Sequence, residues 1–559
     1  MKKYFLLLAL LLLFAGSSYS QTWQTQFINT GATTIYDLAS NSSPQWIAQD
    51  SAYPYNIHVV MMYVPLNDPS TFPSRRTKYY FSSNLGLAWE YIGNANERKS
   101  GFPSIMVASD GAAVICNYGS TSGNTSTRTL IYQDVLAGLG AFILHDPPNN
   151  PYFFGKFCLT SDINLPTKFL IMGQGMTSDS TVRITGPIPW SSWSSFANTS
   201  PEAYCAARGA DGRIGIVYIQ NNFSVDDYKS VYFTETTNNG VSFSTPLKIY
   251  LANFSSDSLA AFRGLNIAYR GNTPCVVFET VKQDPVSGSY FMKAPAKIMF
   301  WSSRLSGSDP YRSIPIAHKG NVPIPPADSI KTGVNDQFGS LSRPVVGVSS
   351  DTNTVFVVFQ AFTDKWGGTP PDTTNFKALY ISKASDNFIF TPPKKFTPDS
   401  PLRDWSFPSI SAYNKQDEPS YYYTAYVTAL SDAIPGTYIN ANGNGQSLAE
   451  LYFIKIKTGQ DISVKNISEE IPESYALEQN YPNPFNSMTN IKFKVASSKF
   501  TRLVVYDMLG KEVATLVNEQ LQPGSYSVRF DAGNLPSGVY FYTLKAGDFS
   551  ETKRMIYLK

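Results

Sequence analysis

The chain has 559 residues, more than a single hydrophobic core usually organises, so two or three domains are expected. Aromatic residues make up 14% and charged residues only 16%, below the roughly 25% charge that is usual for soluble domains. The net charge is +3 and no run of Lys or Arg follows Lys3, which excludes a nucleic-acid-binding footprint. Abundant aromatic residues, Gly and Pro predict an all-β protein of short strands joined by turns.

Histidine and cysteine limit the chemistry further. The three histidines lie far apart in the sequence and form no zinc-binding spacing: His58, His145 and His318. The four cysteines each lie in an apolar, strand-like run: Cys116, Cys158, Cys205 and Cys275. In an exported chain they allow two disulfide bonds in any of three pairings, and four buried thiols are the equal alternative.

Residues 1–20 have the pattern of a secretory signal peptide. Lys2 and Lys3 precede an apolar run from Phe5 to Phe14, and small residues lead to an expected cleavage between Ser20 and Gln21. The apolar run is too short to cross a bilayer, and no later segment approaches ~20 apolar residues. We therefore expect export and no transmembrane segment in the mature chain.

A repeated unit extends over residues 46–457. Each unit has an apolar strand, a polar turn and a second, very apolar strand, and most units add a third strand. Turns such as Asp110-Gly111 and Asp211-Gly212 supply the positive φ that tight hairpins need. One such unit cannot bury both faces, so the seven units predict a seven-bladed β-propeller over residues 21–457, with six blades as the alternative. The last unit lacks an outer strand, and the strand-like residues 23–29 are expected to supply it.

Two turns in this region carry a recurring motif. Residues 82–89 read Ser-Ser-Asn-Leu-Gly-Leu-Ala-Trp, residues 236–243 read Thr-Thr-Asn-Asn-Gly-Val-Ser-Phe, and residues 382–390 form a looser copy. The motif resembles the Asp-box, Ser-x-Asp-x-Gly-x-Thr-Trp, of sialidases and other BNR-repeat propellers. The resemblance implies a structural role, with Asx capping the turn and Gly left-handed, for eight residues: Ser82, Asn84, Gly86, Trp89, Thr236, Asn238, Gly240 and Phe243.

Sialidase activity would need three arginines that clamp a carboxylate, a Tyr activated by Glu, and an Asp acid. The Phe/Tyr-Arg-Ile-Pro motif of that family does not precede Ser82, and the nearest string, residues 311–315, is interrupted by Ser313. Arg208, Arg263 and Arg343 begin or flank inner strands, where channel-lining and core-edge roles fit equally. The sequence therefore favours a non-catalytic propeller, and a glycoside hydrolase of sialidase-like architecture is the alternative.

Several loops favour binding of an extracellular glycan or protein. Insertions at 306–342, 363–375 and 431–446 carry Gly, Pro, Asn and Tyr. Trp190 and Trp193 have the spacing of a sugar-stacking platform, although packing between blades is the favoured interpretation. No cofactor is expected; calcium in the turn at Asp351 is a candidate, but the spacing is not that of an EF-hand.

A polar linker is predicted at 458–474, and strand alternation resumes over residues 475–559, which predicts a small Ig-like β-sandwich. Residues 477–486 read Leu-Glu-Gln-Asn-Tyr-Pro-Asn-Pro-Phe-Asn, and residues 505–510 read Val-Tyr-Asp-Met-Leu-Gly. Residues 535–540 then read Leu-Pro-Ser-Gly-Val-Tyr. Together these segments resemble the type A C-terminal sorting domain of type IX secretion cargo from Bacteroidetes-type bacteria. The residues that carry the resemblance are Pro482, Asn483, Pro484, Gly510, Gly524, Gly538, Tyr540 and Lys559.

The resemblance implies that the outer-membrane secretion machinery recognises this domain and then removes it. The mature propeller would reach the cell surface or the medium after passing through the periplasm.

Overall fold

The computed structural model describes most of the chain after the N-terminal segment. The described residues are 24–34, 43–69, 71–122, 127–160, 168–175, 180–187, 189–221, 228–252, 257–284, 286–306, 312–331, 338–368, 373–385, 388–415, 422–435, 447–459, 465–468, 472–486, 488–532 and 535–559. The predicted signal peptide and its cleavage site between Ser20 and Gln21 lie outside them. The chain divides into a larger unit, residues 25–417 with 424–456, and a smaller unit centred on residues 457–559.

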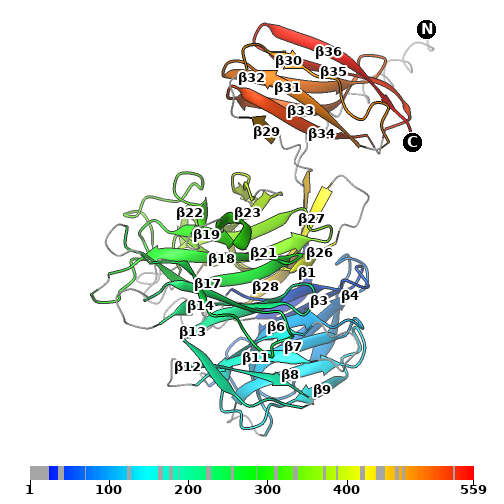
Figure 1. Cartoon of the computed structure of the whole chain (residues 1–559). Coiled ribbons are helices and arrows are strands. Elements are labelled where there is room, and N and C mark those ends of the chain that lie inside the picture. The colour runs from blue at the N-terminus through cyan, green and yellow to red at the C-terminus, as the bar shows by residue number, and fades with distance from the viewer. Residues whose placement is uncertain are drawn as a thin grey trace, which may run out of the picture. The chain divides into compact units, whose positions relative to one another are not determined.

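The larger unit consists of sheets that follow one another along the chain (Figure 1), and their strands pair antiparallel except for the short parallel pair of β21 with β26. We number them 1 to 7. Sheets 1 and 2 contain β2 (Ile47–Gln49), β3 (Ile57–Tyr63), β4 (Arg76–Ser82) and β5 (Glu90–Asn94), then β6 (Ser100–Val107), β7 (Ala113–Ser120), β8 (Thr127–Asp134) and β9 (Phe142–His145). Sheets 3 and 4 share β13 (Ser194–Arg208); they contain β10 (Phe153–Leu159), β11 (Phe169–Gln174) and β12 (Ser180–Gly186), then β14 (Ile214–Gln220), β15 (Val231–Thr236) and β16 (Leu247–Tyr250).

Three further sheets complete this unit. Sheet 5 contains β17 (Leu259–Arg270), β18 (Thr273–Lys282), β19 (Lys297–Ser302) and β20 (Ile314–Ala317), with the single-turn helix α1 (Ser303–Ser306) after β19. Sheet 6 contains β21 (Leu341–Ser349), β22 (Val355–Gly367), β23 (Thr374–Ala384) and β24 (Lys394–Lys395), and β26 (Tyr413–Asn414) pairs with β21. Sheet 7 contains β25 (Asp404–Ile410), β27 (Tyr422–Asp432), β28 (Ala449–Gly459) and β1 (Gln24–Thr34).

The first strands of the sheets form a closed ring. In the order β2, β6, β10, β13, β17, β21 and β25, each contacts the next, and β25 contacts β2. Strand β1 is the outermost strand of sheet 7, next to β28, where Thr30 Oγ1 donates to the Leu451 carbonyl at 2.9 Å. The N-terminal strand therefore completes the last sheet, as the sequence predicted, and the larger unit is a β-propeller.

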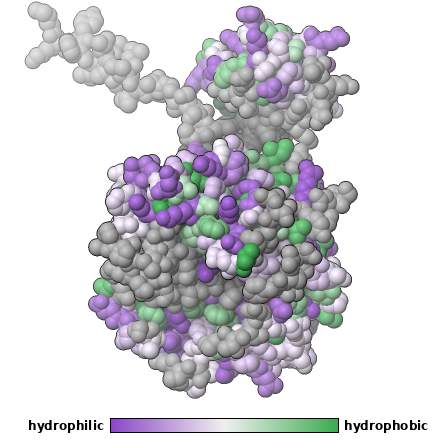
Figure 2. Space-filling view, turned by 90° about the vertical axis from the view of Figure 1, so that its left-hand side faces the viewer, coloured by the Kyte–Doolittle hydropathy of each residue, from purple (hydrophilic) through white to green (hydrophobic). Residues whose placement is uncertain are grey.

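The strands of this ring carry apolar residues on both faces, which accounts for their burial between neighbouring sheets. Because each sheet packs between two others, strands such as β21 and β23 are buried along their whole length. One core cluster joins Val277 and Phe300 of sheet 5 to Val357 and Phe359 of sheet 6. All four cysteines are free and buried in such strands, so the structure contains thiols and not the alternative disulfides. On the face in Figure 2, hydrophobic residues form small groups among hydrophilic ones.

The smaller unit contains two four-stranded sheets that face each other. One has the order β29 (Lys465–Ser468), β34 (Gly524–Asp531), β31 (Met488–Val495), β30 (Ala476–Leu477). The other has the order β33 (Glu512–Leu521), β32 (Lys499–Tyr506), β35 (Gly538–Ala546), β36 (Phe549–Tyr557). Strict alternation of exposed and buried residues along β31 places one face of its sheet in a core shared with the second sheet.

Strand β29 lies inside the residues predicted to be a linker, and it pairs with β34. In the described part of the chain, no helix is long and apolar enough to cross a membrane.

Candidate functional site

The first strands carry the same irregularity near their N-terminal ends. In sheets 2 to 7 the pairing between first and second strand shifts register there, which marks a β-bulge. The residue two positions before regular pairing resumes has a φ between 52° and 57° in five of these sheets: Phe102, Phe154, Glu202, Arg343 and Phe407. The residue at this position in sheet 5 is Arg263. A left-handed conformation costs a non-glycine residue about 1–2 kcal/mol, so its repetition marks this end of the ring, here called the mouth.

Aromatic side chains line the mouth at sheets 2 and 3. The Tyr118 ring lies 5.4 Å from Phe153 and stacks at 6.5 Å on Phe154, measured between centroids. The Arg75 guanidinium lies 4.9 Å from the Phe102 centroid, which holds a cation against this row. Apart from Arg75, which is buried, these side chains are half-buried. The row therefore offers aromatic surface to a ligand.

Charged side chains line the mouth at sheets 4 to 6. The Glu279 carboxylate accepts the backbone N–H of Arg263 at 3.2 Å and that of Arg343, in the next sheet, at 2.6 Å. Burial, together with the nearby Arg343 charge, lowers the pKa of Arg263 to about 10 against the opposing effects of Glu279 and Glu202. Burial raises the pKa of Tyr290, whose ring packs at 4.3 Å on Phe262. Two arginines, two carboxylates and a tyrosine therefore meet at one place.

Part of the charged side is covered. Arg343 is buried, and its guanidinium lies 5.5 Å from the ring of Phe338, a residue of the long insertion between sheets 5 and 6. Lys377 lies on the same ring at 5.0 Å and forms a buried ion pair with Asp404 at 3.1 Å. Because Arg263 and Tyr290 stay half-buried, they are the members of this group that a ligand can reach.

A separate cavity of about 490 Å³ lies along the axis, towards the other end of the first strands. Its lining mixes apolar residues with Ser, Gln, Asn, Thr and Tyr side chains, and among the lining residues only Arg208 is charged. The structure therefore brings together two of the three predicted arginines, Arg263 and Arg343, and places Arg208 elsewhere. The wall of this cavity also includes Tyr269. The Tyr269 hydroxyl donates to Glu235 at 2.6 Å, so it already has a partner.

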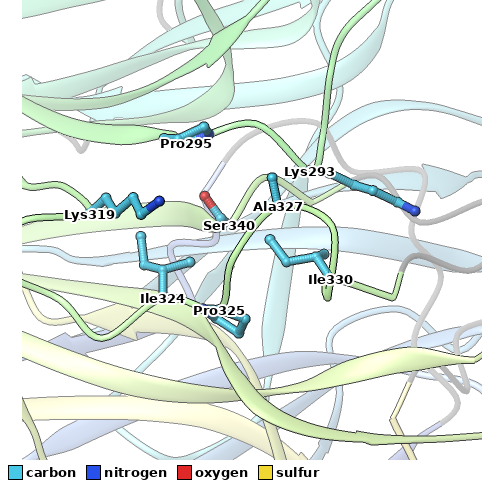
Figure 3. A pocket seen from close by; sticks show the side chains of 8 residues that line it. All are labelled: Lys293, Pro295, Lys319, Ile324, Pro325, Ala327, Ile330 and Ser340. Carbon is cyan, nitrogen blue, oxygen red and sulfur yellow. The ribbon is translucent and has the colours of Figure 1, made fainter.

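A second pocket lies beside the insertion between sheets 5 and 6 (Figure 3). Figure 3 shows the Lys319 side chain pointing towards Ser340, whereas Lys293 extends away from it. The volume is about 10 Å³, which is room for one water molecule at most, so the pocket belongs to the packing of the insertion.

The two turn motifs form the same hydrogen bonds. In the first, Ser82 Oγ accepts the Gly86 N–H at 2.9 Å and Asn84 Oδ1 accepts the Ala88 N–H at 2.9 Å. In the second, Thr236 Oγ1 accepts the Gly240 N–H at 3.1 Å and Asn238 Oδ1 accepts the Ser242 N–H at 2.9 Å. The terminal aromatic residues pack inwards: Trp89 lies 5.1 Å from Phe453, and Phe243 lies 4.0 Å from the Arg183 guanidinium.

The other predicted candidates already have partners within the propeller. The Trp190 ring lies where a Cβ on Gly186 would stand, and Trp193 donates to the Pro148 carbonyl at 2.8 Å. Asp351 accepts hydrogen bonds within its own turn, at 2.5 Å from Ser349 Oγ and at 3.0 Å from the Asn353 N–H. Within the described ranges, no group of three or more His, Cys, Asp or Glu side chains could hold a metal ion.

In the smaller unit, the residues of the predicted sorting motif mostly gather at one end of the sandwich. Asn483 Oδ1 accepts the Ile556 N–H at 2.9 Å, between the cis peptide bonds that precede Pro482 and Pro484. Gly538 pairs with Tyr557, Tyr540 Oη donates to the Pro536 carbonyl at 2.8 Å, and the Lys559 N–H donates to Ser537 Oγ at 3.0 Å. Gly510 turns the chain after β32 at this end with a φ of 77°, whereas Gly524 pairs with Val495 at the other end.

Sequence reasoning missed the aromatic row and the acidic residues of the mouth. A signal was present, because the tetrapeptide Phe-Pro-Ser-Ile occurs at 102–105 and again at 407–410, and Arg343-Pro344 occupies the matching place in sheet 6. Glu279 and Tyr290 have no such local signal.

Comparison with known families identifies the C-terminal region. Residues 479–558 match the secretion system C-terminal sorting domain. The match confirms the predicted type IX sorting domain, which directs the chain to the cell surface or the medium and implies interaction with the secretion machinery. No curated protein matches the chain.

Solved structures with a similar fold include propeller enzymes and a lectin. A fungal alcohol oxidase of the AA5 family is 12% identical, with 96% of this chain and 100% of that chain covered and a TM-score of 0.38. A sialidase of Trypanosoma rangeli is 8% identical, with 95% and 88% covered and a TM-score of 0.35. The six-bladed fucose-binding lectin of Aleuria aurantia is 11% identical, with 66% and 99% covered and a TM-score of 0.35.

Proposed function

We propose that this exported chain displays a seven-bladed propeller that binds an extracellular glycan at its mouth without transforming it. The observation that carries the proposal is the half-buried row of Phe102, Tyr118, Phe153 and Phe154 at sheets 2 and 3, together with the half-buried Arg263 at the same mouth in sheet 5. Sugar rings stack on aromatic faces, and arginine donates paired hydrogen bonds to hydroxyl or carboxylate oxygens. We further propose that the sheets are blades of BNR type, that the two turn motifs are structural Asp-boxes, and that the smaller unit is Ig-like.

A glycan array probed with the mature chain, residues 21–559, tests the binding proposal. A double substitution, Phe102→Ala with Phe154→Ala, should weaken binding of the selected glycan by about tenfold or more, because stacking contacts at the centre of a site carry much of its affinity. Tyr55→Ala is the matched control, since Tyr55 is 63% exposed in the turn between β2 and β3 at the other end of the first strands. Undiminished binding by the double variant, or capture of proteins but no glycan, would contradict the proposal.

The alternative is a glycoside hydrolase of sialidase-like architecture. One observation favours it: Arg263 and Arg343 meet Glu279, Glu202 and Tyr290 at the mouth. Against it, Arg343 is buried and Glu279 already accepts two backbone N–H groups, so neither is free to act on a substrate. Turnover of a fluorogenic sialoside by the mature chain, abolished by Arg263→Met, would establish the hydrolase and replace the binding proposal.

A further inference from the structure

The smaller unit exposes its large hydrophobic side chains at one end. Among its described residues six such side chains are exposed, and five of them lie where β32, β36 and the loop before β31 meet: Tyr481, Met488, Met508, Leu509 and Leu558. The sixth, Phe500, lies near the start of β32, towards the other end. Of the five, Leu509 is 93% exposed, Tyr481 80% and Met508 72%. We call this set the apolar end.

The strand ladder fixes where the apolar end lies. Tyr506 pairs with Phe541 just before the turn that carries Met508 and Leu509, and Gly538 pairs with Tyr557, next to Leu558. Phe485 links the two sheets at this end: its N–H donates to the Ile556 carbonyl at 3.0 Å. Leu477 of β30 pairs with Phe493 towards the opposite end of β31. The apolar end is thus the end of β31 that lies away from this pairing.

Hydrogen bonds hold the most exposed part of this end in one conformation. Asp507 Oδ1 accepts the N–H groups of Leu509 and Lys511, each at 2.9 Å, and the Asp507 carbonyl accepts the Gly510 N–H at 3.1 Å. The turn therefore presents Met508 and Leu509 to solvent without contributing them to the core. Preformed, exposed apolar side chains that the fold does not use are typical of a protein-binding surface.

We propose that the apolar end is the surface by which the sorting domain docks onto a protein of the outer-membrane secretion machinery. A domain that sorts its cargo must be bound by the system that carries it, and the match over residues 479–558 identifies that partner class. Apolar side chains on a rigid turn fit an apolar groove in a protein, where a few central anchors carry most of the affinity. The residues of the sorting motif support this end: Asn483, Tyr540 and Lys559 form side chain–backbone hydrogen bonds around it, and Gly538 pairs with Tyr557.

Export of the full chain by a bacterium with a type IX system tests the inference. The double variant Met508→Ser with Leu509→Ser should fall about tenfold in surface and medium protein and collect in the periplasm, because two interface anchors are lost. Phe500→Ser removes a side chain that is 60% exposed away from this end and should be exported normally. Met508→Leu with Leu509→Met keeps the surface apolar and should also be exported.

The purified double variant should keep the thermal midpoint of the parent chain, which separates docking from folding. Normal export of the double variant, or an equal loss in Phe500→Ser, would overturn the inference. A chain that lacks residues 477–559 serves as the reference. If this chain also reached the surface, the sorting role of the whole domain would be contradicted, and not only the docking role of the apolar end.

Discussion

At the scale of single residues, His58 couples the stability of the propeller to pH. Burial lowers the pKa of His58 to about 3, and its Nδ1 lies 2.8 Å from Tyr79 Oη. The unfolded chain binds a proton near pH 6.5, whereas the folded chain stays neutral down to about pH 3. The stability that depends on neutral His58 is therefore complete above pH 6.5 and is lost as the pH falls towards 3.

We expect the free energy of unfolding to fall by about 2 kcal/mol less between pH 7 and pH 5 in His58→Gln than in the parent chain. Glutamine does not titrate but keeps a polar partner for Tyr79. Urea unfolding at the two pH values measures the difference. Parallel pH profiles for the two chains would show that His58 does not make this contribution.

Substitution of Gly86 separates the cost of a left-handed backbone conformation from the cost of a steric clash. Its φ is 78°, and a Cβ there would lie 2.2 Å from Phe453 Cε1, a buried ring. Gly271 has a φ of 58° and open space around it. Alanine at either position should cost about 1 kcal/mol for the left-handed conformation. Gly86→Ala should cost about 2 kcal/mol more, because the ring must move. Urea unfolding of both variants checks this, and equal losses would contradict it.

At the scale of elements, β1 decides whether sheet 7 has an open edge. A chain that starts at residue 35 exposes the edge of β28, and we expect it to lose about 5 kcal/mol, or about 5 °C in thermal midpoint, and to associate. Calorimetry and size-exclusion chromatography measure both effects against a chain that starts at residue 21. A synthetic peptide of residues 24–34, added in excess, should restore part of the loss. An unaffected truncated chain would mean that β1 is dispensable.

The sequence predicted the strands better than the site, and for a physical reason. Strand segments such as Val355–Phe359 and Cys275–Phe278 are buried between sheets, so their continuous apolar runs are visible in the sequence. The position of β1 followed from a missing outer strand. The sequence did not predict the mouth, because its residues come from six sheets and meet only when the ring closes.

The cover over Arg343 was also invisible, because Phe338 belongs to an insertion without periodicity. Strand β29 has only four residues among polar neighbours, too few to show a strand pattern inside the predicted linker.

At the scale of the whole molecule, the sorting domain decides where the propeller acts. The chain without residues 477–559 should accumulate in the periplasm, and no propeller should be accessible to protease added to intact cells. Cell fractionation with detection of the propeller measures this, and a cytoplasmic marker controls for lysis. The purified truncated chain should bind the same glycan as the full chain. Loss of binding on truncation would show that the smaller unit takes part in recognition.

The pairing of β1 with β28 also sets the order in which the propeller is completed during synthesis. Thr30 and Leu451 are 421 residues apart, yet they share one hydrogen bond. Synthesis produces β1 first among the propeller strands and its neighbour β28 last. Strand β1 therefore stays unpaired until β28 has been made. Contacts of such long sequence separation form slowly and late in folding. Sheet 7 is therefore completed only after almost the entire propeller has been synthesised.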